Sequence, residues 1–366
     1  MLMSTLSLKS DRQAAHLPVC AAPLNSQTFP IGSSTHAKMA KMMPFRDLPT
    51  RPRMVVPQWL STKEEKEINY TLSLVNGVYQ VHKQEEEATN ELIRTFASRD
   101  DDVFVCTFCK SGTTWVQQII TLLLNNGEQG EKNYTSVVPW MESLLFTQSA
   151  NQPRGPGRDH EAKGWTLEKI KSNPERRFFK SHANLKQLPV GTAKGVKVIY
   201  VARNPKDVSV SLYHHVRNKQ GGVFGGDESD MIRCFVQGRC ENGSWFNHVL
   251  EWWEAAQADP EHVLFLHYED LLKDREGNIR KIAQFAGIEH TPETIAKTMQ
   301  ASTFDAMRQN AKVNIRPGEN HFRKGGAGGW RDVYTVRESE AFDQIYMEQM
   351  EGTGLAMDFG EGLVMP

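Results

Sequence analysis

Residues 101–127 read DDVFVCTFCKSGTTWVQQIITLLLNNG. The run VFVCTF is short, apolar and rich in β-forming residues, which predicts a buried strand over 101–108. Apolar residues then recur at helical intervals from Trp115 to Leu123, so a helix should follow, with Gly127 at its end. The turn between them, CKSGTTW, has the composition of a phosphate-binding loop. Its order differs, because Lys110 precedes Gly112 instead of following it.

The same alternation of strand and helix recurs along the chain. Further strands are predicted at 176–182, 196–202 and 262–268, and helices at 205–218 and 269–287. Strands that alternate with helices predict a parallel sheet covered by helices on both faces. Ligands of such sheets bind outside the carboxyl ends of the strands. We therefore expect an α/β fold, a single domain with a central parallel sheet, whose site lies at that edge.

Composition narrows the classes of partner. The chain has 366 residues and a formal net charge of -1, which gives no support for a nucleic-acid or membrane-surface partner. No apolar run reaches the roughly 20 residues that a membrane-spanning helix needs. Five cysteines without framework spacing favour a reduced, intracellular location, and the lone pair Cys106 and Cys109 does not favour a metal site.

The two ends of the chain differ from its middle. Residues 1–55 contain few acids and are interpreted as a disordered leader, with an organelle transit peptide as the alternative. Residues 56–350 are expected to form the domain, and residues 351–366 a C-terminal tail.

Two stretches carry groups that bind anions. Gly112 lets the backbone approach an anion closely, and the helix that begins at Thr113 offers its N-terminal amides. Lys110 adds a full positive charge. Arg203 ends the strand 196–202, and Ser211 lies in the helix after it, so both can face the same ligand. The alternative for Arg203 is a surface ion pair with Asp207, which is worth little.

Two further stretches add to this pattern. In FRKGGAGGW (322–330), two cations precede four glycines, whose amides could surround an anion; a flexible linker is the alternative. In FFKSH (178–182), Lys180 and His182 alternate and should point to the same face of a strand. A neutral histidine can take a proton from a hydroxyl group, and a lysine beside it can stabilise a transferred anion. The alternative is a structural histidine.

The motifs TFCKSGTTWV, FFKSH, VIYVARNPKDVSVSLYHH, FLHYEDLLKD, STFDAM and FRKGGAGGW resemble those of the cytosolic sulfotransferases, in the same order and at similar spacing. The resemblance covers about residues 65–350. It implies a P-loop-like sulfotransferase fold. It also implies transfer of a sulfuryl group from 3′-phosphoadenosine 5′-phosphosulfate (PAPS) to a hydroxyl or amine of a small molecule, without a metal.

The resemblance also implies roles for individual residues. His182 would be the general base, and Lys110 and Lys180 would stabilise the transferring sulfate. Trp115 would stack on the adenine. The residues that bind the donor would be Lys110, Ser111, Gly112, Thr113, Thr114, Trp115, Arg203, Ser211, Tyr268, Ser302, Thr303, Phe304, Met307, Arg323, Lys324 and Gly325.

Other implications concern partners. The segment RDVYTVRESE (331–340) resembles the short dimerisation motif of the family, so a homodimer is expected. The location would be cytoplasmic, with organelle import through residues 1–50 left open. The acceptor is not indicated: it would be a phenol, a sterol-like alcohol or a smaller polar metabolite. Candidate residues of its pocket are Trp140, Phe146, His160, Trp165 and Phe224.

The sequence departs from the family pattern at one place that matters. Phe108 and Cys109 stand where Tyr-Pro is common, which leaves the rigidity of the loop open. Three other functions were considered. A small-molecule kinase would need Gly-Lys-Ser/Thr and an aspartate that holds a metal. A catalytically inactive PAPS-binding protein would not need Lys110, Lys180 and His182. A Golgi carbohydrate sulfotransferase would be expected to carry an N-terminal anchor.

Overall fold

The computed structural model describes residues 70, 72–80, 86–144, 165–190, 193–217, 224–315, 322–360 and 362–365. Contacts divide the chain into two units, residues 1–41 and 42–366, and all the described residues belong to the second. The predicted leader lies outside the described residues, as do Phe146 and His160.

Four parallel strands form the central sheet. Their order is β4 (Phe178–Ser181), β3 (Val103–Thr107), β5 (Lys197–Ala202) and β6 (Val263–His267). All four predicted strands are confirmed. Strand β3 lies inside the sheet with every residue buried, which explains its unbroken apolar sequence.

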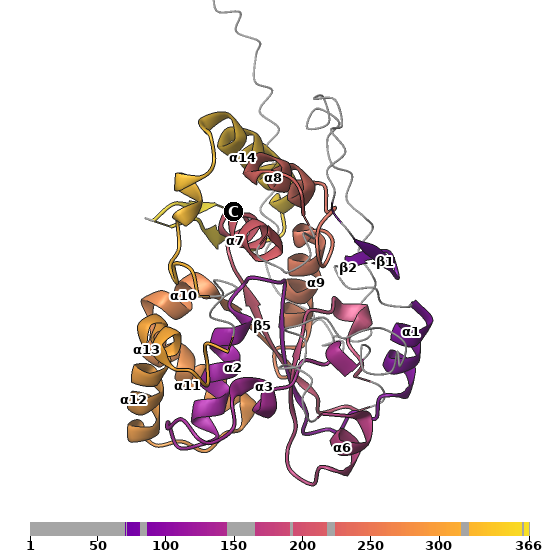
Figure 1. Ribbon diagram of the computed structural model, residues 1–366, viewed down its shortest axis with the longest axis vertical. Helices are drawn as coiled ribbons and strands as arrows, with labels where there is room; N and C mark the ends of the chain where they lie inside the picture. The colour runs from indigo at the N-terminus through magenta and orange to yellow at the C-terminus, as the bar shows by residue number, and fades with distance from the viewer. Residues whose placement is uncertain are drawn as a thin grey trace, which may run out of the picture. The chain divides into compact units, whose positions relative to one another are not determined.

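Helices cover both faces of this sheet (Figure 1). Successive strand residues point to opposite faces, so Val198 and Tyr200 of β5 join one core while Ile199 and Val201 join the other. The first core includes residues of α7 (Pro205–Arg217), α8 (Glu228–Val236) and α9 (Trp245–Ala258). The second includes residues of α2 (Thr113–Leu123), α11 (Arg275–Ala286) and α12 (Pro292–Ala301).

The helix predicted over 269–287 is divided in two. Helix α10 (Tyr268–Lys273) ends at Asp274, whose side chain accepts from Gly277 N and so caps the start of α11. Helix α11 ends at Gly287 in a left-handed conformation, φ 61°, as the sequence predicted.

Shorter elements complete the described part. The helices are α1 (Glu86–Thr95), α3 (Tyr134–Val137), α6 (Leu167–Ser172), α13 (Phe304–Gln309) and α14 (Val336–Met350), with 3-10 helices η3 (Leu185–Gln187) and η5 (Gly329–Asp332). Antiparallel pairs are formed by β1 (Ser73–Val75) with β2 (Val78–Gln80), and by β7 (Met357–Asp358) with β8 (Val364–Met365).

Residues after α14, within the predicted C-terminal tail 351–366, pack against the domain. Leu355, Met357 and Phe359 are buried in the core. The indole Nε1 of Trp330 donates to the carbonyl of Phe359 at 2.9 Å. This contact joins the segment to the glycine-rich stretch before α14.

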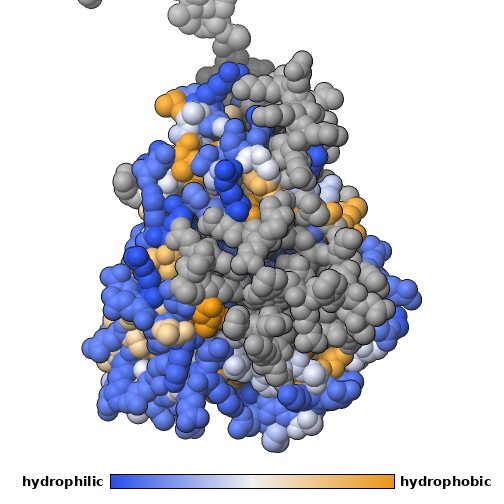
Figure 2. All heavy atoms as spheres, viewed as in Figure 1, coloured by the Kyte–Doolittle hydropathy of each residue, from blue (hydrophilic) through white to orange (hydrophobic). Residues whose placement is uncertain are grey.

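Hydrophilic residues predominate on the coloured part of the face in Figure 2, where apolar residues are scattered. Among the described residues, no helix is both long and apolar enough to cross a membrane.

Candidate active site

The predicted site residues follow the carboxyl ends of the parallel strands. The loop 108–112 follows β3, His182 follows β4, Arg203 follows β5 and Tyr268 follows β6. Because these strands are parallel neighbours, their ends bring the four segments to one edge of the sheet.

The turn after β3 has an unusual backbone. Lys110 and Gly112 both have positive φ angles, 69° and 102°. A left-handed lysine costs about 1–2 kcal/mol, and such strain is concentrated at ligand sites. At Gly112 a Cβ atom would lie 2.8 Å from the Tyr268 ring, so a larger residue would clash. The turn therefore depends on close packing against Tyr268.

Helix α2 begins directly after this turn. Among the described residues no side chain caps it, and its first turn contains no acid. The positive end of the helix dipole therefore has no negative partner from the first turn of the helix itself. A helix start of this kind favours a bound anion.

Arg203 joins the two loops of the site. Its Nη1 donates to Lys110 O at 3.2 Å and its Nη2 to Gly326 O at 3.0 Å. The guanidinium stacks over the Tyr268 ring, 4.5 Å from the ring centroid. Asp207 lies 3.7 Å away, with side chains only 11% and 2% exposed, so the pair is not the surface ion pair considered from sequence.

Asp207 holds the glycine-rich loop in place. Its two carboxylate oxygens accept from Gly328 N at 2.7 Å and from Trp330 N at 2.9 Å. The amide of Gly328, one of the glycines whose amides were predicted to surround an anion, thus donates to the protein instead. Gly325 serves another purpose: a Cβ there would lie 2.1 Å from the Phe304 ring, so glycine is needed for packing.

Two guanidinium groups lie near each other at this end. Burial, and then the charge of Arg203, lower the pKa of Arg323. Lys324 forms an ion pair with Asp332 at the surface. Ser211 lies one turn after Asp207 on α7 and is partly buried. An anion between the arginines would relieve their repulsion.

The residues predicted for the adenine side gather around Trp115. Its Nε1 donates to Ser302 O at 2.8 Å, and its ring meets Tyr268 edge-on at 5.4 Å. Met307 is buried beside it. Thr303 caps α13 by accepting from Ala306 N.

Three buried polar atoms at this site have no hydrogen-bond partner within the described part of the chain. They are Ser111 Oγ, Ser302 Oγ and Arg203 Nε. Buried polar groups nearly always have partners. These three therefore indicate a polar ligand between the loop, Arg203 and Ser302.

His182 is held as a neutral imidazole. Its Nδ1 lies 2.9 Å from Thr107 O, and a carbonyl only accepts, so Nδ1 carries the hydrogen and Nε2 keeps its lone pair. Burial lowers the pKa of His182 well below its usual value, and the charges of Lys180 and Lys110 lower it further. The ring is therefore neutral at pH 7, as a general base requires.

Trp140 lies beside both Lys180 of β4 and His182, the residue that follows it. Lys180 Nζ is 4.6 Å from the Trp140 ring centroid, and the His182 ring is 6.0 Å away. Their shared neighbour agrees with the predicted alternation. Of the other candidate pocket residues, Trp165 donates to Ser136 O, and Phe224 packs against Tyr70.

Several residues around the base had no signal in the sequence. Glu142, Tyr200 and His248 contact His182 directly or through one another, as described below. Glu142 and His248 belong to no quoted motif, and Tyr200 lies in the motif that contains Arg203 but was given no role. Among the described residues, no group of three or more His, Cys, Asp or Glu side chains is placed to hold a metal ion.

Comparisons with known proteins identify the family. Residues 100–354 match the family model of the sulfotransferase domain. Human sulfotransferase 1C2 is 33% identical over 273 residues, which cover 72% of this chain and 88% of that protein. Dog sulfotransferase 1B1 is 34% identical over 278 residues, with the same coverage.

Solved structures of related proteins have a similar fold. Mouse sulfotransferase SULT7A1 complexed with PAP has a TM-score of 0.62 and 27% identity, covering 77% of this chain and 95% of that chain. Retinol dehydratase in a complex with retinol and PAP has a TM-score of 0.64 and 25% identity, covering 76% and 88%. The predicted α/β sulfotransferase fold is thus confirmed. The chain belongs to the sulfotransferase family and is an enzyme of sulfuryl transfer, as its sequence motifs predicted.

Proposed function

We propose that this sulfotransferase moves a sulfuryl group from PAPS to a hydroxyl or amine of a small molecule, with His182 as general base. One observation carries the proposal: a neutral histidine with an available Nε2 lies beside an anion-binding turn on the neighbouring strand. The two solved relatives that hold PAP, the nucleotide left when PAPS loses its sulfuryl group, support the donor.

The donor would lie along the loops that follow β3, β5 and β6. Lys110, Ser111, Gly112, Thr113 and Thr114 would hold the 5′-phosphosulfate, while Arg203, Ser211, Arg323, Lys324 and Gly325 would hold the 3′-phosphate. Trp115, Tyr268, Ser302, Thr303, Phe304 and Met307 would enclose the adenine. The three buried atoms without partners support this placement.

The transfer step needs little covalent help from the protein, so positioning and charge dominate, as in phosphoryl transfer. The acceptor oxygen forms a bond to sulfur while the bond from sulfur to the 5′-phosphate oxygen breaks. His182 Nε2 takes the acceptor proton, and PAP leaves with the electron pair. Lys110 and Lys180 stabilise the negative charge on the leaving and transferring oxygens.

The acceptor would be a hydroxyl compound with an apolar body. The aromatic face of Trp140 beside His182 supports this class, since it offers an apolar contact next to the base. Retinol dehydratase, a structural relative, is known with retinol bound. Phenols, sterol-like alcohols and small polar metabolites should be compared as acceptors, and the first two should be sulfated faster.

The function is tested by incubating the protein with labelled PAPS and this panel. We expect label transfer from PAPS and no phosphate transfer from ATP. Phosphate transfer would support the kinase alternative. Tight PAPS binding without transfer to the panel, or to any metabolite of a cell extract analysed by mass spectrometry, would support the inactive binding protein.

A homodimer and a cytoplasmic location are further parts of the proposal. Val336, at the start of α14 within the segment 331–340, is 75% exposed, which suits a contact between two copies. Val336→Glu should give a monomer by light scattering, whereas Leu124→Glu, a matched exposed position, should not.

A fluorescent fusion at the C terminus of the full chain should be diffuse in the cytoplasm; accumulation in an organelle would assign a transit role to the leader.

A further inference from the structure

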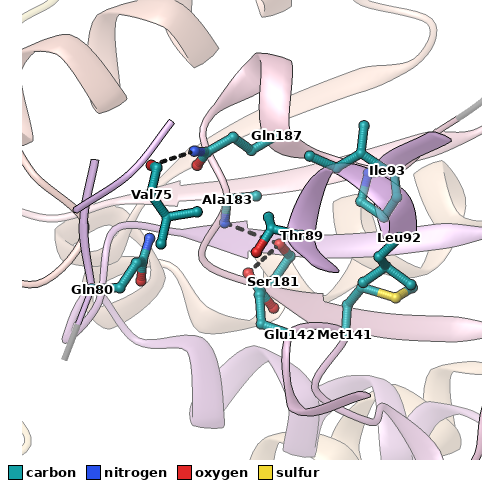
Figure 3. Close-up of a pocket in the computed structure, with 11 residues that line it drawn as sticks. Val75, Gln80, Thr89, Leu92, Ile93, Met141, Glu142, Ser181, Ala183 and Gln187 are labelled. Atoms are coloured by element: carbon teal, nitrogen blue, oxygen red, sulfur yellow. Dashed lines mark hydrogen bonds between the residues drawn. The ribbon is translucent and has the colours of Figure 1, made fainter. Parts of the chain in front are cut away.

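The backbone N–H of His182 is hydrogen-bonded to the carboxyl group of Glu142. Glu142 Oε1 accepts from His182 N at 2.6 Å and from Ser181 Oγ at 2.7 Å. Ser181 Oγ in turn accepts from Ala183 N at 3.0 Å. Figure 3 shows Glu142, Ser181 and Ala183 together at the end of β4. One carboxyl oxygen thus fixes the path of the chain on both sides of the base.

The segment that carries Glu142 is itself attached to β4. Lys180 N donates to Pro139 O, and Met141 N donates to Lys180 O, both at 2.8 Å. The second oxygen of Glu142 is buried and has no partner in the described part of the chain. A cavity of about 30 Å³ adjoins the carboxyl, which is enough for a water molecule.

On its C=O side, His182 is held by a second histidine. His248 Nε2 lies 3.2 Å from His182 O, and His248 Nδ1 lies 2.8 Å from the Tyr200 hydroxyl. A carbonyl only accepts, so Nε2 carries the hydrogen and Nδ1 accepts from Tyr200. Burial lowers the pKa of His248 to about 4, which keeps this ring neutral.

A ring contact links this pair to the donor loop. The Phe108 ring meets the His248 ring edge-on, with 5.5 Å between the ring centroids, and Phe108 leads into the turn at Lys110. The path therefore runs from Phe108 through His248, which is hydrogen-bonded to Tyr200, to the carbonyl of His182. The base and the donor turn are joined through side chains of β5 and α9.

Packing alone does not account for these groups. A buried carboxyl and a buried histidine are costly compared with apolar residues of similar volume. Their polar atoms meet the main chain of a residue whose ring must reach the acceptor proton. A displacement of about 1 Å at such a residue can lower a rate about 100-fold.

We propose that Glu142 and the Tyr200–His248 pair are positioning residues, which fix His182 through its main chain and keep it in register with the donor turn. This inference rests on the proposed role of His182 as the base. It concerns residues that do not themselves take part in the transfer.

Tyr200→Phe is the central test, because it removes the hydroxyl but keeps the ring stacked on Trp252 and Phe265. We expect kcat to fall about 10-fold to 100-fold while the dissociation constant of PAP stays unchanged. The acid limb of kcat/KM for PAPS should move toward pH 6.5, because a loosened His182 ring is better solvated. Tyr346→Phe, which removes another buried hydroxyl from the same core, should leave both kcat and the acid limb of kcat/KM unchanged.

Glu142 is tested by two substitutions. Glu142→Gln keeps an oxygen acceptor for His182 N and Ser181 Oγ and should retain most of the activity, while Glu142→Met should lose it as Tyr200→Phe does. If Glu142→Met does not fold, the Tyr200→Phe result decides.

The outcomes separate this inference from the proposed function. If His182→Ala still transfers sulfate, His182 is not the base and the proposed function needs another one. If His182→Ala is inactive but folded Tyr200→Phe keeps the wild-type kcat and pH profile, the positioning role is refuted and the role of His182 stands.

Discussion

The two halves of the site are built differently. The donor half, around Lys110, Arg203 and Arg323, gathers positive charges and contains buried polar atoms without partners in the described chain. The transfer half, around His182, is neutral at its base, and both the ring and the main chain of that base are hydrogen-bonded. The donor half would gain partners from a bound anion, whereas the base of the transfer half is held by the protein itself before substrates bind.

This difference follows from what each half does. Recognition of phosphate and sulfate gains from unneutralised cations, and repulsion between them is relieved when the anion binds. Proton transfer gains from a desolvated, immobile base, because the acceptor proton must meet Nε2 in one geometry. Substitutions in the first half should therefore change affinity, and those in the second should change turnover.

Lys110 is expected to act in both halves, because its charge would bind the donor and also stabilise the leaving oxygen. Lys110→Ala should lower kcat about 100-fold to 1,000-fold, because charge on the leaving oxygen loses its stabilisation. PAP should still bind through Arg203 and Arg323. The control is Lys171→Ala, an exposed lysine of α6. If only PAP affinity falls and kcat is retained, Lys110 belongs to the donor half alone.

Arg203 tests the donor half. Arg203→Ala should weaken binding of PAP about 10-fold to 100-fold, the range expected for hydrogen bonds to a charged group of 1.5–3 kcal/mol. Binding of 5′-AMP, which lacks the 3′-phosphate, should change much less in calorimetric titrations. Equal losses for both nucleotides would show that Arg203 acts through the loops it joins, by its contacts to Lys110 O and Gly326 O.

Lys180 tests the electrostatics of the transfer half. Its charge is the second cause, after burial, of the low pKa of His182. Lys180→Met should therefore raise that pKa toward 6.5, which an NMR titration of labelled histidine in the free enzyme would detect. Because the base must be neutral, activity is lost as pH falls through this pKa, so the acid limb should move to higher pH. An unchanged titration would mean that the charge of Lys180 does not contribute to the low pKa.

The fold was predicted correctly from the sequence, and the sequence also offered candidate residues for the donor half, but it did not indicate the surroundings of the base. The four strands were readable because each is a short apolar run that is buried by helices. The loop at Lys110 and the segment at Arg203 are continuous in sequence, so their motifs show directly. The glycines of the stretch 322–330 were predicted to offer their amides to an anion. The amide of Gly328 donates to Asp207 instead, while Gly325 makes room for Phe304, a packing role that the sequence did not indicate.

The residues that position His182 come from distant parts of the chain. Glu142, Tyr200 and His248 lie up to 66 residues from the base and meet it only through the folded sheet and α9. Glu142 and His248 sit in segments without a recognisable motif. The strand pattern predicts burial for Tyr200, but it does not predict that its hydroxyl reaches a histidine of α9.

The most direct test of the central claim is to measure PAP binding and sulfate transfer of His182→Ala side by side with the wild type. We predict that kcat falls about 100-fold to 10,000-fold, the range of general-base contributions, while the dissociation constant of PAP is unchanged. Near-normal transfer by the folded variant would contradict the claim that His182 is the base and that the two halves of the site divide binding from chemistry.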